Sequence, residues 1–218
     1  MKNKDYLLFD LDGTLTDPKE GITKAVQYAL KHYGIQVDDL DSLCPFIGPP
    51  LKDSFQKYYD FPEAQAKEAI QVYREYFSDK GWSQNKVFPG IPKMLGELKA
   101  AGKKLYLATS KPEVFAKQIM EHFGLASYFE FIGGADLEET RVRKGDVIRY
   151  VLDTCGLSDK KEKVLMIGDR EHDVLGAREQ GLECVGVLLG YGDRKEMEEC
   201  QAAYIAASIN ELRKMLLS

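Results

Sequence analysis

The chain has 218 residues, 44% of them hydrophobic and 30% charged, which is enough for one well-packed core but short for two full domains. The net charge of −5 excludes the basic footprint of a nucleic-acid-binding protein, and no stretch approaches the roughly 20 apolar residues of a membrane span. The apolar run before Asp10 is too short for a signal peptide, so we predict a cytoplasmic protein whose oligomeric state the sequence leaves open.

The first predicted strand is the apolar run of residues 6–9, which ends at Asp10 and Asp12. A short apolar run bounded by turn residues is typical of a strand buried on both faces of a parallel sheet. Side chains two residues apart point to the same side of a strand, so both acids are expected just past its carboxyl end, where open α/β sheets bind ligands. Two adjacent carboxylates require a proton or a cation between them, and both conditions suit phosphoryl transfer. The alternative is a pair of surface acids in a tight turn.

Helices dominate the next segment, from about residue 17 to residue 88. Asp17 and Pro18 resemble an N-cap and a first helical position, and two further helices are expected at about 51–59 and 63–77. We predict that residues 17–88 form a helical cap, inserted into a core domain of residues 1–16 and 89–218 and closing over the site as a lid. The Gly48–Pro50 turn is expected to face the substrate, with Lys52 contacting an anionic leaving group or simply solvated.

After this insertion, strands and helices alternate. Apolar runs predict strands at 105–108, 164–167 and 185–189 and a weaker one at 129–132. Helical periodicity is found at 112–123 and 145–155, and Ser208 opens a last helix with a capping box. The alternation predicts an α/β fold with a doubly wound, mostly parallel sheet.

Polar residues follow several of these strands. Thr109 and the adjacent Ser110 offer a hydroxyl and backbone N–H groups to a phosphate oxygen, although a threonine at such a turn is, taken alone, more often a helix cap. Lys144 precedes a helix and could neutralise a phosphate, or lie in solvent. Asp169 and Asp173 have the oxygen ligands and the spacing that suit Mg²⁺, or they favour a helix N-terminus for dipole reasons.

In this order the motifs resemble those of the haloacid-dehalogenase-like (HAD) phosphatase superfamily. They are D-x-D-G-T-L at Asp10–Leu15, the Thr109 turn, Lys144, and G-D-x-x-x-D at Gly168–Asp173. The inserted helices resemble the cap of the group that contains phosphoglycolate phosphatases, β-phosphoglucomutases and haloacid dehalogenases. The segment Phe46–Phe55 is similar to the cap loop of phosphoglycolate-phosphatase-like and bacterial 5′-nucleotidase-like members.

This resemblance implies a Mg²⁺-dependent phosphomonoesterase that works in two steps on a small phosphorylated metabolite such as phosphoglycolate or a nucleoside monophosphate. Asp10 would attack phosphorus and form an aspartyl-phosphate, while Asp12 would act first as an acid and then as a base. The implied Mg²⁺ ligands are Asp10, the backbone carbonyl of Asp12, Asp169 and Asp173. The implied phosphate-binding groups are Gly13, Thr109, Ser110 and Lys144.

Some features of the chain differ from these relatives and keep alternatives open. Gly145 follows Lys144 where many relatives have Pro, and Arg141 and Arg143 lie nearby as competing cations. Leu51 occupies a cap position where mutases tend to carry a basic residue, which weakens a phosphomutase interpretation. Asp12 argues against a dehalogenase. A receiver-like phosphoprotein, which also has a phosphorylatable Asp, is the non-enzymatic alternative.

Overall fold

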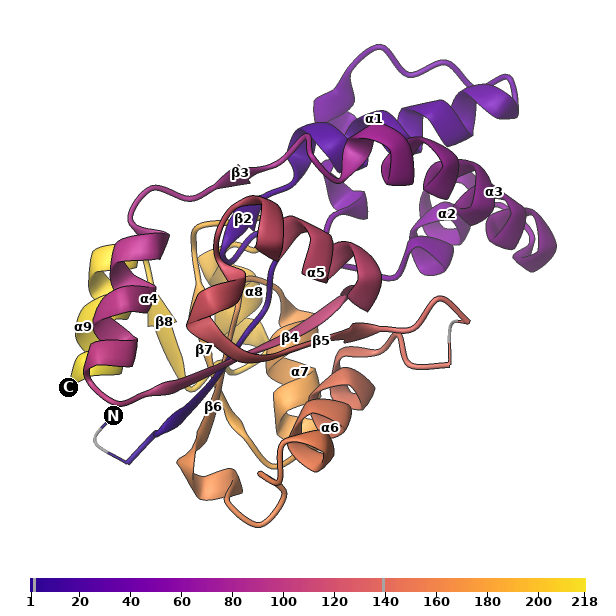
Figure 1. Cartoon of the computed structure of the whole chain (residues 1–218). Helices are drawn as coiled ribbons and strands as arrows, with labels where there is room; N and C mark the ends of the chain where they lie inside the picture. Colours follow the sequence, from indigo (N-terminus) through magenta and orange to yellow (C-terminus); the bar gives the residue numbers. More distant parts are fainter. Residues whose placement is uncertain (2, 139) are drawn as a thin grey trace. The chain divides into compact units, whose positions relative to one another are not determined.

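The computed structural model describes residue 1 and residues 3–138 and 140–218. The chain divides into two compact units, one made of Met1–Asp17 and Val87–Ser218 and the other of Pro18–Lys86 (Figure 1). We refer to them as the core unit and the helical unit.

The core unit contains a six-stranded sheet with the order β5-β4-β1-β6-β7-β8. Its strands are β1 (Tyr6–Phe9), β4 (Lys104–Pro112), β5 (Phe129–Ala135), β6 (Val164–Gly168), β7 (Glu183–Val187) and β8 (Tyr204–Ala206). All neighbouring strands are parallel, and Phe9 at the end of β1 lies between Leu107 of β4 and Ile167 of β6. The carboxyl ends of these three central strands therefore meet at one edge of the sheet.

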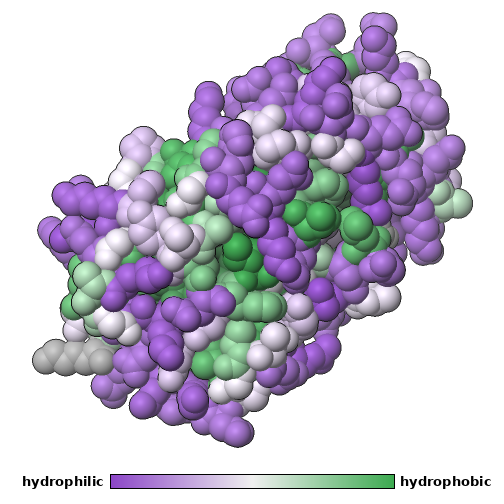
Figure 2. Space-filling model, in the orientation of Figure 1, coloured by the Kyte–Doolittle hydropathy of each residue, from purple (hydrophilic) through white to green (hydrophobic). Residues whose placement is uncertain are grey.

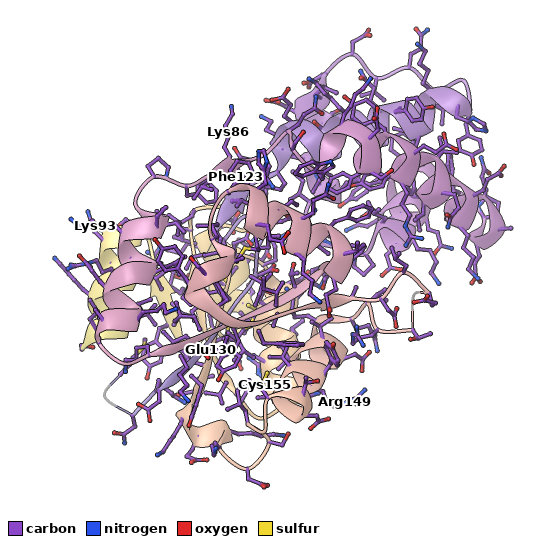
Figure 3. The ribbon with its side chains drawn as sticks, viewed as in Figure 1. Lys86, Lys93, Phe123, Glu130, Arg149 and Cys155 are labelled. Atoms are coloured by element: carbon purple, nitrogen blue, oxygen red, sulfur yellow. The ribbon has the colours of Figure 1, made fainter. Side chains whose placement is uncertain are left out.

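Helices accompany this sheet. They are α4 (Ile91–Ala100), α5 (Glu113–His122), α6 (Lys144–Thr154), α7 (Glu171–Glu179), α8 (Arg194–Glu199) and α9 (Ile209–Leu217), with short 3-10 turns at Ala126–Tyr128 and Lys161–Lys163. In α6, Val147, Ile148 and Val151 are fully buried against alternate residues of β1, β4 and β6, while Arg149 projects outward (Figure 3). Parallel strands alternating with amphipathic helices confirm the predicted α/β fold.

Several strand boundaries in the core unit differ from the predicted ones. β5 continues past its predicted end at residue 132 to Ala135. β4 continues through Lys111 to Pro112, where we expected a turn, because it stays paired with β5 across an irregularity between Thr109 and Pro112. β7 covers Glu183–Val187 and ends two residues before the predicted end. The edge strand β8 was not predicted, since its three residues are too few for a hydrophobic period and Tyr204 is exposed.

The helical unit contains α1 (Lys19–His32), a 3-10 helix (Leu40–Phe46), α2 (Leu51–Tyr59) and α3 (Glu63–Tyr76), which a π-helical turn (Phe77–Gly81) extends. Aromatic rings fill its interior: Phe55 stacks on Phe61 at 5.7 Å between ring centroids and meets Phe46 edge-on at 5.1 Å. The predicted N-cap role of Asp17 is wrong. Pro18 takes the N-cap position of α1 with no side-chain hydrogen bond, and Asp17 lies in the short strand β2 (Thr16–Asp17).

Strand β2 forms a separate two-stranded sheet with β3 (Lys86–Val87), so the two segments that join the units are paired with each other.

Hydrophilic residues cover most of the face seen in Figure 2. Among the described residues, no helix combines the length and the apolar composition needed to cross a membrane.

Candidate active site

Asp10 and Asp12 lie directly after β1, at the edge where the central strands end. The Asp10 N–H continues the sheet by donating to the carbonyl of Ile167 at 2.9 Å. The chain then turns, with Gly13 at φ +77°, a conformation that side chains disfavour. A Cβ on Gly13 would also lie 2.1 Å from Oδ2 of Asp169, so this position has no room for a side chain. The D-x-D-G sequence thus brings the turn into contact with the acid that follows β6.

Lys144, at the start of α6, pairs with two carboxylates. Its Nζ lies 2.8 Å from Oδ1 of Asp10 and 3.0 Å from Oδ1 of Asp173, and donates to the carbonyl of Ala108 at 3.1 Å. The contact with Asp173 is an ion pair without hydrogen-bond geometry, because that buried Oδ1 has no hydrogen-bond partner among the described residues. The lysine side chain is only 4% exposed. Lys144 therefore bridges the end of β1, the Ala108 carbonyl of β4 and the first turn of α7.

Asp12 is held by a different cation. Lys111 Nζ lies 2.8 Å from Oδ2 of Asp12, and the two side chains are 4% and 11% exposed. The other oxygen, Oδ1, is buried and has no hydrogen-bond partner among the described residues. The two acids of the D-x-D motif thus have separate partners, with Lys144 on Asp10 and Lys111 on Asp12.

Asp169 and Asp173 come from the end of β6 and the start of α7. Oδ1 of Asp169 accepts from the Thr14 hydroxyl at 3.2 Å, and its Oδ2 accepts from the Tyr191 N–H at 2.8 Å. Oδ2 of Asp173 accepts from the Arg170 N–H at 3.1 Å, which caps the first turn of α7. Both acids are 1% exposed. Both carboxylates are therefore held by hydrogen bonds within the protein, and both are shielded from bulk water.

Two more glycines make this packing possible. A Cβ on Gly168 would lie 2.1 Å from Cγ of Asp173, and one on Gly190 would lie 2.2 Å from Oδ2 of Asp169. These distances are far below van der Waals contact. Glycine at these positions lets the backbone approach the carboxylates as closely as it does.

The electrostatics of the site follow from its burial. Desolvation raises the pKa of Asp12, and Lys111 partly opposes this effect. Desolvation, with the charges of Asp173 and Asp10, holds the pKa of Asp169 well above its usual value, and desolvation raises the pKa of Asp173 to about 6. Burial acts to lower the pKa of Lys144, but the carboxylates of Asp10 and Asp173 outweigh it and the pKa is raised. Burial therefore disfavours the ionised form of Asp12, Asp169 and Asp173, while Lys144 keeps its positive charge.

Asp10, Asp169 and Asp173 form a cluster that could hold a metal ion. Each offers one carboxylate oxygen, and these three oxygens lie within 4.8 Å of one another. Oxygen-only ligands converging in this way are typical of sites for hard divalent cations. A cation there would also offset the repulsion between the carboxylates, which adds to the effect of burial on the pKa values of Asp169 and Asp173.

The other predicted site residues are placed as follows. Thr109 is 1% exposed near the end of β4, where its Oγ1 accepts from the Lys111 N–H at 3.3 Å, and Ser110 lies between them. Gly13 uses its own N–H to bind the Thr16 carbonyl at 2.7 Å. Lys52 lies in the helical unit, where its Nζ is 3.7 Å from Glu63.

The competing cations before α6 point elsewhere. Arg141 donates to the carbonyl of Gly134 at 3.0 Å and lies 3.7 Å from the ring centre of Tyr150, and Arg143 is exposed. Of the three candidates, Lys144 is the one that contacts Asp10.

Sequence reasoning missed Lys111, Thr14 and Tyr191. Lys111 follows Thr109 by two residues, and on a strand this spacing places both on one side. The prediction that β4 ends at Ala108 concealed that signal. Tyr191 has no comparable signal, since its N–H binds Asp169 and its hydroxyl donates to Asp17 through the tertiary fold.

Comparison with known proteins defines the family. Residues 7–187 match the family model described as haloacid dehalogenase-like hydrolase, so the chain belongs to that family, as its motifs indicated. A protein from Pseudomonas aeruginosa named 5′-nucleotidase is 49% identical over 97% of this chain and 95% of that protein. The tyrosine-protein kinase PtkA of Mycobacterium tuberculosis is 39% identical over 99% of this chain and 73% of that protein.

Two further likenesses bear on substrate and fold. A Colwellia psychrerythraea protein named phosphoglycolate phosphatase is 26% identical over 97% of this chain and 96% of that protein. The crystal structure of a predicted phosphatase from Clostridium acetobutylicum has a TM-score of 0.95 and 50% identity, covering 98% of both chains. The chain is thus a HAD-like hydrolase in both sequence and structure.

Proposed function

We propose that this protein is a Mg²⁺-dependent phosphomonoesterase that acts through an aspartyl-phosphate on Asp10. The observation that carries the proposal is the pair of buried acids after β1, each with its own lysine partner, beside the cluster of Asp169 and Asp173. A nucleophile, a proton carrier and fixed positive charge are the parts that phosphoryl transfer needs. Relatives named 5′-nucleotidase and phosphoglycolate phosphatase support this reaction class.

The residues present fit a divalent cation. Four buried carboxylates (Asp10, Asp12, Asp169 and Asp173) face two ammonium groups (Lys111 and Lys144), which leaves an excess of two negative charges when all are ionised. The buried Oδ1 of Asp173 also lacks a hydrogen-bond partner among the described residues. We assign Asp10, Asp169, Asp173 and the backbone carbonyl of Asp12 as the groups that would hold Mg²⁺. When bound, the ion would neutralise charge on the phosphoryl oxygens.

In the first step, a carboxylate oxygen of Asp10 attacks phosphorus as the ester P–O bond breaks. The leaving alkoxide takes a proton from Asp12, and the alcohol is released. Burial raises the pKa of Asp12 and so favours the protonated form that this step requires, although the Lys111 ammonium partly opposes the effect. In the second step Asp12 removes a proton from water, which attacks the aspartyl-phosphate and regenerates Asp10 with release of inorganic phosphate.

We assign the phosphoryl oxygens to Lys144, the Thr109 hydroxyl, the Ser110 N–H and backbone N–H groups near Gly13, whose own N–H already donates to the Thr16 carbonyl. Lys144 is already fixed by Asp10, Asp173 and the Ala108 carbonyl, so its charge needs no rearrangement to meet a phosphate. Prearranged charge of this kind is usually a large term in catalysis.

The helical unit is assigned the role of a cap that reads the organic portion of the substrate, with Lys52 as a contact for an anionic group. Phosphoglycolate remains a candidate on the cap-loop resemblance. The 49% identity to a protein named 5′-nucleotidase favours a nucleoside monophosphate as the second candidate.

The test is phosphate release by the purified protein from a panel of phosphomonoesters that includes phosphoglycolate and nucleoside 5′-monophosphates, with Mg²⁺ or with EDTA. We expect turnover with Mg²⁺ and none with EDTA. Formation of an isomeric phosphate ester would instead indicate a mutase. Transfer of phosphate to a protein tyrosine, or a phosphoprotein that forms once and does not turn over, would also contradict the proposal.

A further inference from the structure

The ion pair between Lys111 and Asp12 lies outside the contacts that the mechanism above uses. Lys111 is buried beside the site although it belongs to neither the nucleophile nor the acidic cluster. A buried lysine is costly unless it is paired, and this one is paired with the residue assigned to proton transfer.

The backbone around Lys111 holds its position firmly. Lys111 lies in an irregular part of β4, between the residues Thr109 and Pro112 that pair with β5, and its N–H donates to the Thr109 hydroxyl at 3.3 Å. The neighbouring strand β5 comes so near that a Cβ on Gly134 would lie 2.6 Å from the Lys111 carbonyl oxygen. The Lys111 side chain therefore projects from a backbone segment that is packed closely against β5.

The two oxygens of Asp12 are in different environments. Oδ2 lies 2.8 Å from Lys111 Nζ, whereas Oδ1 is buried and has no hydrogen-bond partner among the described residues. The contact with Lys111 restrains Oδ2, and Oδ1 is left for another proton donor or acceptor. In the proposed reaction that other group is the leaving oxygen and, later, the attacking water.

We propose that Lys111 is a positioning residue, which holds Oδ2 of Asp12 so that Oδ1 is aimed at the oxygen that gains and loses the proton. This inference rests on the proposed function for its kinetic consequences, but the orientation of Asp12 can be observed independently. Lys144 forms the corresponding ion pair with Asp10, so each acid of the D-x-D motif is paired with its own lysine. A small misplacement of a reacting group can cost about 10²-fold in rate.

The first test compares Lys111→Met with the wild type in kcat/KM, which reports the step in which Asp12 acts as an acid. With an alkyl phosphate we expect a loss of about 10²-fold, because the leaving alkoxide needs a well-placed proton. With p-nitrophenyl phosphate the loss should be small, since p-nitrophenolate leaves without a proton. Lys111→Arg should recover much of the alkyl phosphate activity, and Lys117→Met, which removes an exposed lysine paired with Glu113, should change neither substrate.

A double-mutant cycle separates positioning from phosphate binding. In an Asp12→Asn background, Lys111→Met should cause no further loss, because the group that it positions is already disabled. Multiplicative losses in the double variant, or equal losses on both esters in the single variant, would overturn the proposal.

Crystal structures of the wild type and of Lys111→Met show, without an activity assay, whether Lys111 orients the Asp12 carboxylate. The Asp12 carboxylate should leave its wild-type orientation in Lys111→Met and recover it in Lys111→Arg, and an unchanged orientation in Lys111→Met would overturn the proposal. If the wild type hydrolyses no phosphomonoester, the proposed function fails, while these structures still determine whether Lys111 orients Asp12. Should Lys111→Met not fold, Lys111→Gln serves in its place, judged by the same two outcomes.

Discussion

The core unit and the helical unit differ in what they bury. The core unit buries nine polar or charged side chains among the described residues, and six of these are the ionisable groups of the site: Asp10, Asp12, Lys111, Lys144, Asp169 and Asp173. The helical unit buries Thr23 and Ser54, and its interior is otherwise aromatic and aliphatic. Burying charge is expensive unless it is paired, so a fold tolerates it mainly where function requires it. The contrast supports the proposal that the chemistry takes place in the core unit and that the helical unit recognises the substrate.

If the chemistry lies in the core unit, removing the nucleophile should have the largest effect of any single substitution. Asp10→Asn should leave the fold intact, since Lys144 keeps Asp173 as its partner, yet abolish turnover and trapping of a phosphoenzyme analogue by beryllofluoride. Phosphate release measures the first effect, and calorimetry with and without beryllofluoride measures the second. Substantial residual turnover would remove Asp10 from the mechanism.

Removing the proton carrier should have the next largest effect. General acid–base catalysis contributes about 10²–10⁴-fold, so Asp12→Ala should lower kcat/KM for an alkyl phosphate by about that factor. The loss should shrink with p-nitrophenyl phosphate, whose leaving group needs no proton. Steady-state kinetics on the two esters provides the measurement, and equal losses would argue against a leaving-group acid.

Lys144 and Arg149 offer a matched pair on one helix. Lys144→Ala removes the buried cation beside Asp10 and should cost about 10²–10³-fold in kcat, as the loss of one prearranged electrostatic contact does. Arg149 has a side chain 59% exposed and pairs with Asp146, so Arg149→Ala should leave kcat unchanged. If Arg143→Ala proved as damaging as Lys144→Ala, the assignment of the phosphate-binding cation would be wrong.

The acidic cluster should make stability depend on pH and on metal. Burial raises the pKa of Asp169 and takes that of Asp173 from 3.8 to about 6, so the folded state binds these protons more tightly than the unfolded state does. The metal-free protein should therefore lose stability as the pH rises from about 4 to about 6, where the unfolded chain has released the protons first. Because Mg²⁺ replaces them, it should raise Tm more at neutral pH than at about pH 4.5. Thermal unfolding in EDTA and in Mg²⁺ tests this, and a Tm gain independent of pH would contradict it.

The smallest expected effect concerns the helical unit. Lys52→Ala should raise KM for phosphoglycolate by at most about fivefold, since a single exposed ion pair contributes about 0.2–1 kcal/mol, and should hardly affect p-nitrophenyl phosphate. Lys67→Ala is a suitable control, because Lys67 also pairs with Glu63 on the surface of this unit. Equal responses on both substrates would exclude Lys52 as a specificity residue.

The sequence predicted those parts of the molecule in which one local pattern dominates. The strands before Asp10 and Asp169 and the helix after Lys144 are continuous or periodic apolar runs, so burial fixes both their type and the edge at which their polar ends meet. Asp17 failed as a cap because a tertiary hydrogen bond from the Tyr191 hydroxyl replaces the local one. Lys111 was missed because Pro112 suggested a turn, whereas β4 continues past an irregularity and Pro112 pairs with Ala135 of β5. In both cases a distant partner outweighed the local signal.

The close approach of Gly13, Gly168 and Gly190 to the carboxylates has a consequence for how this protein tolerates mutation. These residues have no side chain with which to act, yet even a methyl group at any of them would collide with Asp169 or Asp173. In a complete substitution library selected for activity, the three positions should therefore be as intolerant as the acids, and alanine should be rejected no less than tryptophan. Such a library would report where the backbone itself determines the shape of the site, which a search for reactive groups would overlook.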